Sequence, residues 1–482
     1  MRRPMRRRHV LALAATLAAG TGGLVAACAT NPVTGKSQIS LVSEQQEIQM
    51  GQEAAQQVKA TMGFVQDPAL QDYVSRIGMT MAKASERPNL PWEFHVVDDP
   101  SPNAFALPGG FIYVTRGLLT DITNEAQLAT VVGHEIGHVT NRHSVNQISK
   151  QQLATLGLGI GSILSPTVAR FGQLASAGLQ LLFLKYSRDD ETEADKAGFR
   201  YALKDGYDVR QMPAVFEMLK EVSQLQGGGG VPSWLQTHPT EEARIQDIRQ
   251  KLDTLHANLA NAKVGRDAYL QRIQGLVFGD DPRQGYFENG VFYHPELRFQ
   301  LAFPQGWQTQ NTPQAVAAIS PNQDAILQMT LAQGGAQQAA QQFFAQQGIQ
   351  SQNVQTTSVN GLPAVSGYFQ AQTDQGAVAG LVTFLTYGQA TYQILGYTAA
   401  ANLSAYDATF RQVTGSFRQL TDPSKINVQP KKIELVKLPR AMTIEEFNQQ
   451  YPSSIPVEML AIINEVQPGV RMDAGVTVKR VR

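Results

Sequence analysis

The run His134-Glu135-Ile136-Gly137-His138 contains residue types whose spacing suits metal-assisted chemistry. Histidines four residues apart lie on one face of a helix, so both imidazoles can reach the same zinc ion. The glutamate between them is then placed to take a proton from a metal-bound water. The run lies in an apolar stretch that begins at Val131, which favours a buried helix over a helix with two surface histidines. We therefore expect a metal site that performs hydrolysis.

The residues after this run indicate which class of zinc site is present. A metzincin would place glycine at position 141 and histidine at position 144, but this chain has Asn141 and Ser144 there. His143 is one residue away from that register, and we interpret it as a surface histidine. The third metal ligand is therefore expected in a later segment.

An acidic run offers that ligand, because Glu191 and Asp195 are four residues apart and share one helix face. In gluzincins the third ligand is a glutamate that is followed four residues later by an aspartate. On that pattern Glu191 binds zinc, and Asp195 accepts the free imidazole N–H of a ligand histidine and so fixes its tautomer. Glu193 faces another way on the same helix and is the lesser candidate.

The segment before the metal-binding helix is expected to position the substrate. Residues 101–115 contain two extended pieces divided by Pro108 and paired glycines, which predicts a hairpin. In gluzincins an edge strand beside the zinc helix pairs with the substrate backbone, so Asn103, Ala104 and Phe105 are candidate substrate-binding residues. The alternative is an ordinary core hairpin, and the sequence does not separate the two.

Together with Thr237-His238-Pro239 and Arg244, these motifs resemble the zinc metallopeptidase family that includes HtpX, the CAAX prenyl protease and BepA. The family is of the gluzincin type, and the resemblance covers residues 31–260. It leaves two roles open for His238. Either His238 is a fourth zinc ligand that keeps the enzyme latent, or His238 and Arg244 are catalytic groups that stabilise the oxyanion.

The resemblance also implies the remaining roles. His134, His138 and Glu191 would hold one zinc ion per chain, with Glu135 as the catalytic base and Asp195 as the partner of a ligand histidine. The expected fold of this part is a mainly α-helical, α+β gluzincin domain.

The N-terminus has the features of an export signal. Five arginines lie among the first eight residues, and an apolar run then ends at Cys28, the only cysteine of the chain. Val25-Ala26-Ala27-Cys28 resembles a bacterial lipoprotein box, so we expect lipidation of Cys28 and anchoring in the outer membrane, facing the periplasm. Residues 1–27 are then the signal peptide and residues 28–42 a tether, and the export route, Sec or twin-arginine, stays open.

The length of 482 residues predicts roughly two to four domains. We expect the metalloprotease domain at 43–262, an α+β sandwich domain with a faint likeness to PsbP or Mog-type folds at 285–420, and a small LysM-like αβ module at 430–482. The last module suggests contact with peptidoglycan. The equal numbers of basic and acidic residues, 40 each, give no support for nucleic-acid binding.

The expected function is that of a membrane-anchored periplasmic zinc endopeptidase that cleaves misfolded or stalled proteins of the cell envelope. The alternative is a chaperone or assembly factor for outer-membrane proteins whose zinc site is latent. Neither the cleavage specificity nor the oligomeric state follows from the sequence.

Overall fold

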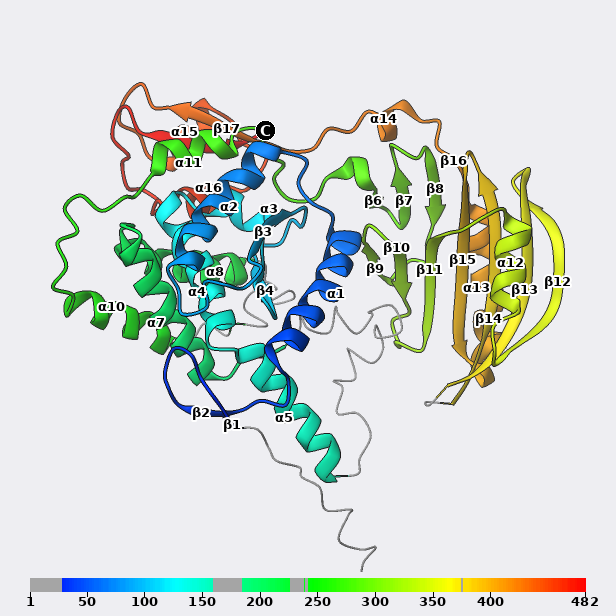
Figure 1. The fold of residues 1–482 in the computed structure, drawn as a ribbon. Coiled ribbons are helices and arrows are strands. Elements are labelled where there is room, and N and C mark those ends of the chain that lie inside the picture. Colours follow the sequence, from blue (N-terminus) through cyan, green and yellow to red (C-terminus); the bar gives the residue numbers. More distant parts are fainter. Residues whose placement is uncertain (1–27, 159–183, 226–237, 239–241, 374–375) are drawn as a thin grey trace, which may run out of the picture.

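The computed structural model describes residues 28–158, 184–225, 238, 242–373 and 376–482 (Figure 1). The predicted signal peptide, Thr237 and Pro239 lie outside these ranges. A mainly helical region and a sheet-rich region lie side by side (Figure 1). Within the described ranges, none of the helices combines the length and the apolar character that crossing a bilayer requires.

The helical region, which contains the predicted metalloprotease domain and is called the peptidase region after that prediction, surrounds one large hydrophobic core. Its elements are β1 (Cys28–Thr30), β2 (Ser37–Ile39), α1 (Glu44–Met62), α2 (Pro68–Lys83), β3 (Glu93–Val97), β4 (Ala104–Leu107), β5 (Phe111–Thr115), α3 (Arg116–Asp121), α4 (Glu125–Thr140), α5 (His143–Leu158), α7 (Arg188–Lys204), α8 (Met212–Leu225), α10 (Glu242–Asp253) and α11 (Arg266–Ile273).

Helix α4 carries the predicted metal-binding run, and every one of its residues is buried. Asn124 caps it, because its side chain accepts a hydrogen bond from the backbone N–H of Gln127 at 3.0 Å. Helix α7 crosses α4 at very short range. A Cβ atom added at Gly198 would lie 2.6 Å from the backbone nitrogen of His134, and one at Gly137 would lie 2.9 Å from the carbonyl of Ala194. Small residues therefore bring the two helices close enough for their side chains to meet.

A three-stranded sheet in the order β3-β5-β4 packs beside α4. Strands β4 and β5 form the predicted antiparallel hairpin, while β3 runs parallel to β5. Strand β4 is an edge strand of this sheet, although its side chains are buried.

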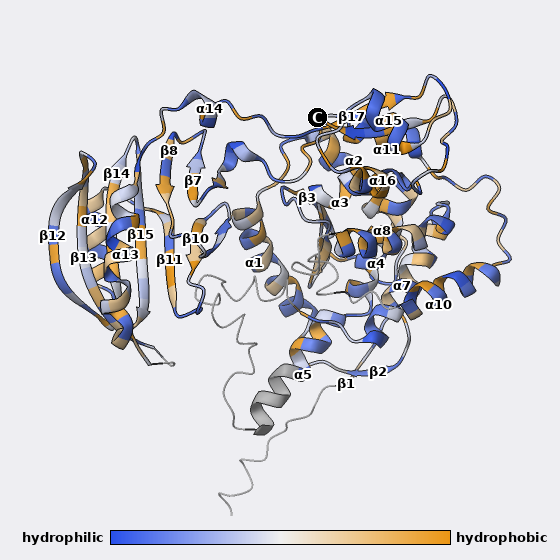
Figure 2. Cartoon of the chain, turned by 180° about the vertical axis from the view of Figure 1, so that it is seen from behind, coloured by the Kyte–Doolittle hydropathy of each residue, from blue (hydrophilic) through white to orange (hydrophobic). Residues whose placement is uncertain are grey.

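The sheet-rich region contains two antiparallel sheets. A seven-stranded sheet has the order β12-β13-β14-β15-β11-β10-β9, and a four-stranded sheet has the order β16-β8-β7-β6. Helix α12 covers one face of the large sheet, while α13 and the small sheet pack on the other face. Strand β12, at the outer edge, is largely hydrophilic (Figure 2). The bounds are β6 (Tyr286–Glu288), β7 (Val291–His294), β8 (Phe299–Ala302), β9 (Gln308–Asn311), β10 (Ala315–Ile319), β11 (Ala325–Ala332), α12 (Ala336–Phe344), β12 (Ile349–Val359), β13 (Leu362–Thr373), β14 (Gly376–Tyr387), β15 (Ala390–Ala399), α13 (Leu403–Ser416), β16 (Arg418–Gln419) and α14 (Pro423–Ile426).

The C-terminal segment, predicted as a LysM-like module at residues 430–482, shares the hydrophobic core of the peptidase region. It contains β17 (Ile433–Lys437), α15 (Ile444–Gln450), α16 (Val457–Asn464) and β18 (Thr477–Val481), and its apolar side chains belong to the same core as α2, α4 and α8. The LysM-like identity is therefore not confirmed, and the core of the peptidase region extends past the predicted end at residue 262.

One buried cation ties this segment to the peptidase region. Lys479 donates hydrogen bonds to the carbonyls of Thr120, Asp121 and Ile122 at 2.7–3.2 Å, at the C-terminal end of α3. Val277 and Lys432 also pair as an isolated antiparallel bridge. The sheet-rich region is consequently an insertion between two adjacent points of one folded unit.

Residues 28–42, predicted as a tether, are also part of the folded unit. The β1–β2 hairpin is followed by a segment in which the backbone N–H of Leu41 donates to the Ser149 hydroxyl at 3.0 Å. The side chain of Asn31 donates to the carbonyl of Asn141, directly after α4. This segment therefore packs against α5 and the C-terminal end of α4.

Candidate active site

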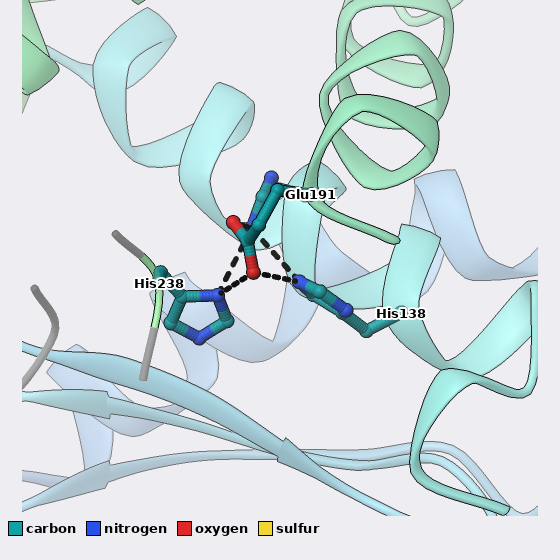
Figure 3. A group of neighbouring side chains, drawn as sticks. His138, Glu191 and His238 are labelled. Atoms are coloured by element: carbon teal, nitrogen blue, oxygen red, sulfur yellow. Dashed lines mark hydrogen bonds and ion pairs between the residues drawn. The ribbon is translucent and has the colours of Figure 1, made fainter. Parts of the chain in front are cut away.

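Four side chains that can bind a metal converge in the peptidase region: those of His134, His138, Glu191 and His238. The histidine pair comes from α4 and Glu191 from the first turn of α7, while His238 precedes α10 (Figure 3). One ligand atom from each of the four residues lies within 4.8 Å of the others, and all four side chains are buried.

The donor set fits a zinc ion. The Nε2 atoms of His134 and His138 are 3.0 Å apart, and a carboxylate oxygen of Glu191 lies 3.5–3.6 Å from each imidazole. Burial lowers the pKa of His138, and the neighbouring His134 and His238 lower it further, so the imidazole is neutral and has a lone pair to offer. Two imidazoles and one carboxylate form a ligand set that Zn²⁺ prefers.

Glu135 lies on α4 between the two histidines and has no exposed surface. One of its carboxylate oxygens is 3.8 Å from Nε2 of His238. The carboxylate thus lies beside the candidate metal ligands, where a general base must be.

Asp195 lies next to the candidate ligand His134, on the side of the ring that faces away from His138. Its carboxylate lies 2.9 Å from Nδ1 of His134, the nitrogen that points away from His138. Burial alone would raise the pKa of Asp195, but the Arg244 guanidinium outweighs it and holds the pKa below its usual range. The ionised carboxylate accepts the His134 N–H, which leaves the Nε2 lone pair directed at the metal position.

The structure revises the role predicted for Arg244. Its Nε and one terminal nitrogen donate to Asp195 at 2.8 and 2.7 Å, and the other terminal nitrogen lies 2.8 Å from Glu191. A guanidinium directed at two carboxylates in this way positions Glu191 and Asp195 and does not face a substrate carbonyl. We therefore assign Arg244 to holding the ligand set, in place of the predicted oxyanion role.

His238 lies among the metal-binding atoms. Its Nδ1 is 2.9 Å from Glu191 and 3.4 Å from Nε2 of His134. Burial would lower the pKa of His238, but the carboxylates of Glu191 and Glu135 raise it above the ordinary histidine value. The imidazole can thus serve as a fourth ligand or as a cation beside the carboxylates, so both predicted roles stay open.

The predicted substrate-binding residues lie at the start of the edge strand β4. Phe105 stacks on Tyr113 inside the core, and Ala104 is fully buried. The backbone of Asn103 pairs with Thr115 on the β5 side. Only the backbone on the outer side of β4 is therefore suited to pairing with an extended peptide.

Two neighbours of His138 were missed or misread in the sequence. His143, predicted as a surface histidine, is only 1% exposed, and its Nδ1 lies 3.0 Å from Nδ1 of His138. Tyr186 stacks on the His138 ring with centroids 4.1 Å apart, and its hydroxyl is 2.8 Å from that of Ser144. A histidine five residues beyond the motif was a visible signal for the first, whereas no local pattern pointed to Tyr186.

Comparison with known proteins gives an independent result. Residues 68–252 match the model of Peptidase family M48. The chain is 30% identical over 256 residues to the Beta-barrel assembly-enhancing protease of Escherichia coli K12, an alignment that covers 51% of this chain and 52% of that protein. It is 31% identical over 231 residues to the Mitochondrial metalloendopeptidase OMA1 of Schizosaccharomyces pombe, covering 46% of this chain and 65% of that protein.

These alignments leave large parts of each protein unmatched. The chain spans about half the length of the curated relatives it matches. Among solved structures, cyanobacterial PsbP from Synechocystis is similar over 27% of this chain with 14% identity and a TM-score of 0.23. A likeness at that level carries no argument about fold, so the predicted resemblance to PsbP stays a prediction.

Proposed function

We propose that this protein is a zinc-dependent endopeptidase of the bacterial cell envelope. The match of residues 68–252 to Peptidase family M48 supports this proposal and agrees with the family resemblance predicted from the sequence. The observation that carries the proposal is the buried convergence of His134, His138 and Glu191 next to Glu135. A bound zinc ion would supply a Lewis acid and an activated water at this point.

Each residue of the site would have its own role in the hydrolysis. His134, His138 and Glu191 would hold the ion, and Asp195 and Arg244 fix two of these side chains in place. Glu135 takes the proton from the attacking water and returns it to the leaving amine. The outer edge of β4, beginning at Ala104, would orient an extended peptide by backbone pairing.

The substrates and the location are part of the same proposal. The relative from Escherichia coli is named as a protease that enhances β-barrel assembly, which supports misfolded or stalled envelope proteins as substrates. The lipoprotein-like sequence at Cys28 supports a lipid anchor in the outer membrane, with the protein in the periplasm. Contact with peptidoglycan is proposed for the exposed surface of residues 430–482, because their apolar side chains complete the core of the peptidase region.

Glu135→Gln tests the activity. The amide keeps the size of the side chain but cannot take a proton, so we expect cleavage of a casein-type substrate to fall at least about 10²–10⁴-fold while one zinc ion is still bound. Glu53→Gln, on the exposed side of α1, is the matched control. Cleavage that survives Glu135→Gln would exclude this carboxylate as the base.

A second candidate function is that of a chaperone with a latent site, and the place of His238 favours it. His238 lies within the ligand set, 2.9 Å from Glu191, where it would exclude a substrate. His238→Ala distinguishes the two roles predicted for His238, an inhibitory zinc ligand or an oxyanion-stabilising group. If His238 is an inhibitory ligand, its removal should raise the cleavage rate, whereas removal of an oxyanion-stabilising group should lower it.

A further inference from the structure

A second imidazole lies directly behind the metal ligand His138. Nε2 of His138 faces His134 and Glu191, so its Nδ1 points away from the metal position. Nδ1 of His143 lies 3.0 Å from that atom, and the His143 side chain is 2% exposed. The far nitrogen of His143, Nε2, lies 3.5 Å from a carboxylate oxygen of Glu193 and 3.7 Å from one of Asp190.

The positions of the hydrogen atoms follow from this order of groups. An ionised carboxylate only accepts hydrogen bonds, so Nε2 of His143, which faces Glu193 and Asp190, must be the donor nitrogen of the ring. Its Nδ1 is then an acceptor, and the only hydrogen that His138 can donate to it is the one on its own Nδ1. This tautomer of His138 leaves the Nε2 lone pair free of a hydrogen and directed at the metal position.

The turn that places His143 beside His138 contains an unfavourable backbone conformation, which other contacts stabilise. Helix α4 ends at Thr140, and the chain reverses through Arg142, a non-glycine residue with φ of +59°. A left-handed conformation is unfavourable for such a residue. It is secured because the Arg142 guanidinium contacts Glu47 at 2.9 Å and donates to the carbonyl of Val42 at 2.9 Å. The reversal brings His143, the first residue of α5, back against His138.

We propose that His143 is a positioning residue for the metal ligand His138, and that Glu193 holds His143 in the tautomer that this role requires. The two ligand histidines are thus supported differently: His134 by the carboxylate of Asp195, and His138 by an imidazole that is itself supported by a carboxylate. The proposal deepens the proposed function and rests on it, because it concerns the same zinc ligands.

The test compares two substitutions of His143 in the purified full-length protein, with zinc affinity measured by competition against a chelator. Asparagine places its Oδ1 near the position of the histidine Nδ1 and can accept the same hydrogen bond, whereas alanine cannot. We expect His143→Ala to weaken zinc binding by about 10–100-fold, and His143→Asn to restore most of the loss. Glu193→Gln should have a smaller effect, because Asp190 also faces His143. His256→Ala, at an exposed histidine, is the control.

Cleavage at two zinc concentrations gives the second measurement. If His143 only positions His138, saturating zinc should recover much of the activity of His143→Ala, whereas Glu135→Gln should stay inactive at any zinc concentration. The thermal unfolding of each zinc-free variant separates positioning from packing. Equal losses of zinc affinity in the alanine and asparagine variants, with equally lowered melting temperatures, would overturn the proposal in favour of a packing role.

The remaining outcomes distinguish this proposal from the proposed function. Wild-type zinc affinity in His143→Ala, with binding abolished in His138→Ala, would refute only the role of His143. A wild-type protein that binds no zinc, or that binds it as tightly after His138→Ala, would refute the proposed function together with this inference.

Discussion

The two regions of the molecule bury different kinds of polar groups. In the described part of the sheet-rich region, the buried polar side chains are all neutral: Ser320, Gln328, Thr383, Thr391, Thr398 and Thr414. The peptidase region buries a large set of ionisable groups, including Glu47, Arg87, Asp121, His134, Glu135, His138, His143, Glu191, Asp195, His238 and Arg244.

This difference indicates where the chemistry lies. A buried charge is costly unless it is paired, so a fold keeps such groups only where other groups compensate for them. Around the metal site the compensation is mutual, since Arg244 pairs with both Glu191 and Asp195. In the core of the sheet-rich region, buried hydroxyl groups donate hydrogen bonds to nearby backbone carbonyls. Thr398, for example, donates to the carbonyl of Asp324.

The largest expected effect concerns which parts of the chain the peptidase region needs. Deleting residues 432–482 should prevent folding, because these residues fill the core around α2, α4 and α8. Replacing residues 281–429 by a short Gly/Ser linker should leave a folded protein that binds zinc, because Val277 and Lys432 already lie side by side. Circular dichroism and zinc titration of both variants test this. A cooperatively folded, zinc-binding protein that lacks residues 432–482 would contradict the shared core.

The second prediction concerns the buried network of charged groups around the candidate metal site. Asp195→Asn replaces a carboxylate that faces both His134 and Arg244, so we expect zinc affinity to fall by about 10–100-fold. Thr383→Val, a buried polar-to-apolar change in the sheet-rich region, should leave zinc affinity unchanged. Chelator competition measures both variants, and an equal effect of the two would remove the distinction between the regions.

A smaller effect is expected from the close helix crossing. Gly198→Ala would place a methyl group 2.6 Å from the backbone nitrogen of His134, so α4 and α7 must move apart. Overpacking of this kind costs about 1–3 kcal/mol, and it also separates Glu191 from the histidines. Chemical denaturation and zinc affinity should change together. Gly415→Ala, where the added methyl group meets open space on α13, is the matched control in the other region.

The smallest expected effect is a decrease in the stability of the sheet-rich region at acidic pH. Burial lowers the pKa of His294 to about 4, so below its ordinary value near 6.5 the unfolded chain binds a proton that the folded chain does not. Stability should therefore decrease as the pH falls from 6.5 to 4, and the decrease should level off below pH 4. His294→Gln should flatten this dependence in thermal melts of the sheet-rich region. An unchanged pH profile would show that other groups control it.

Much of the local structure could be predicted from the sequence. The hairpin before α4, the helix that carries His134 and His138, and the helix on which Glu191 and Asp195 share a face agree with their predicted places. These features depend on interactions between residues only a few positions apart, such as a capping hydrogen bond or the repeat of apolar residues along one face.

The sequence by itself also determined the chemistry of the candidate ligands, because the spacing of His134, Glu135 and His138 and that of Glu191 and Asp195 follow from the geometry of a single helix. Only the tertiary structure decided which groups meet between helices. Arg244 faces the carboxylates of α7. His143 is buried behind His138 because of the left-handed turn at Arg142 and the packing of α7. Residues 433–481 joined a core that is formed by residues more than 150 positions earlier. Contacts of this kind depend on how complete elements pack against each other, and no local pattern specifies that.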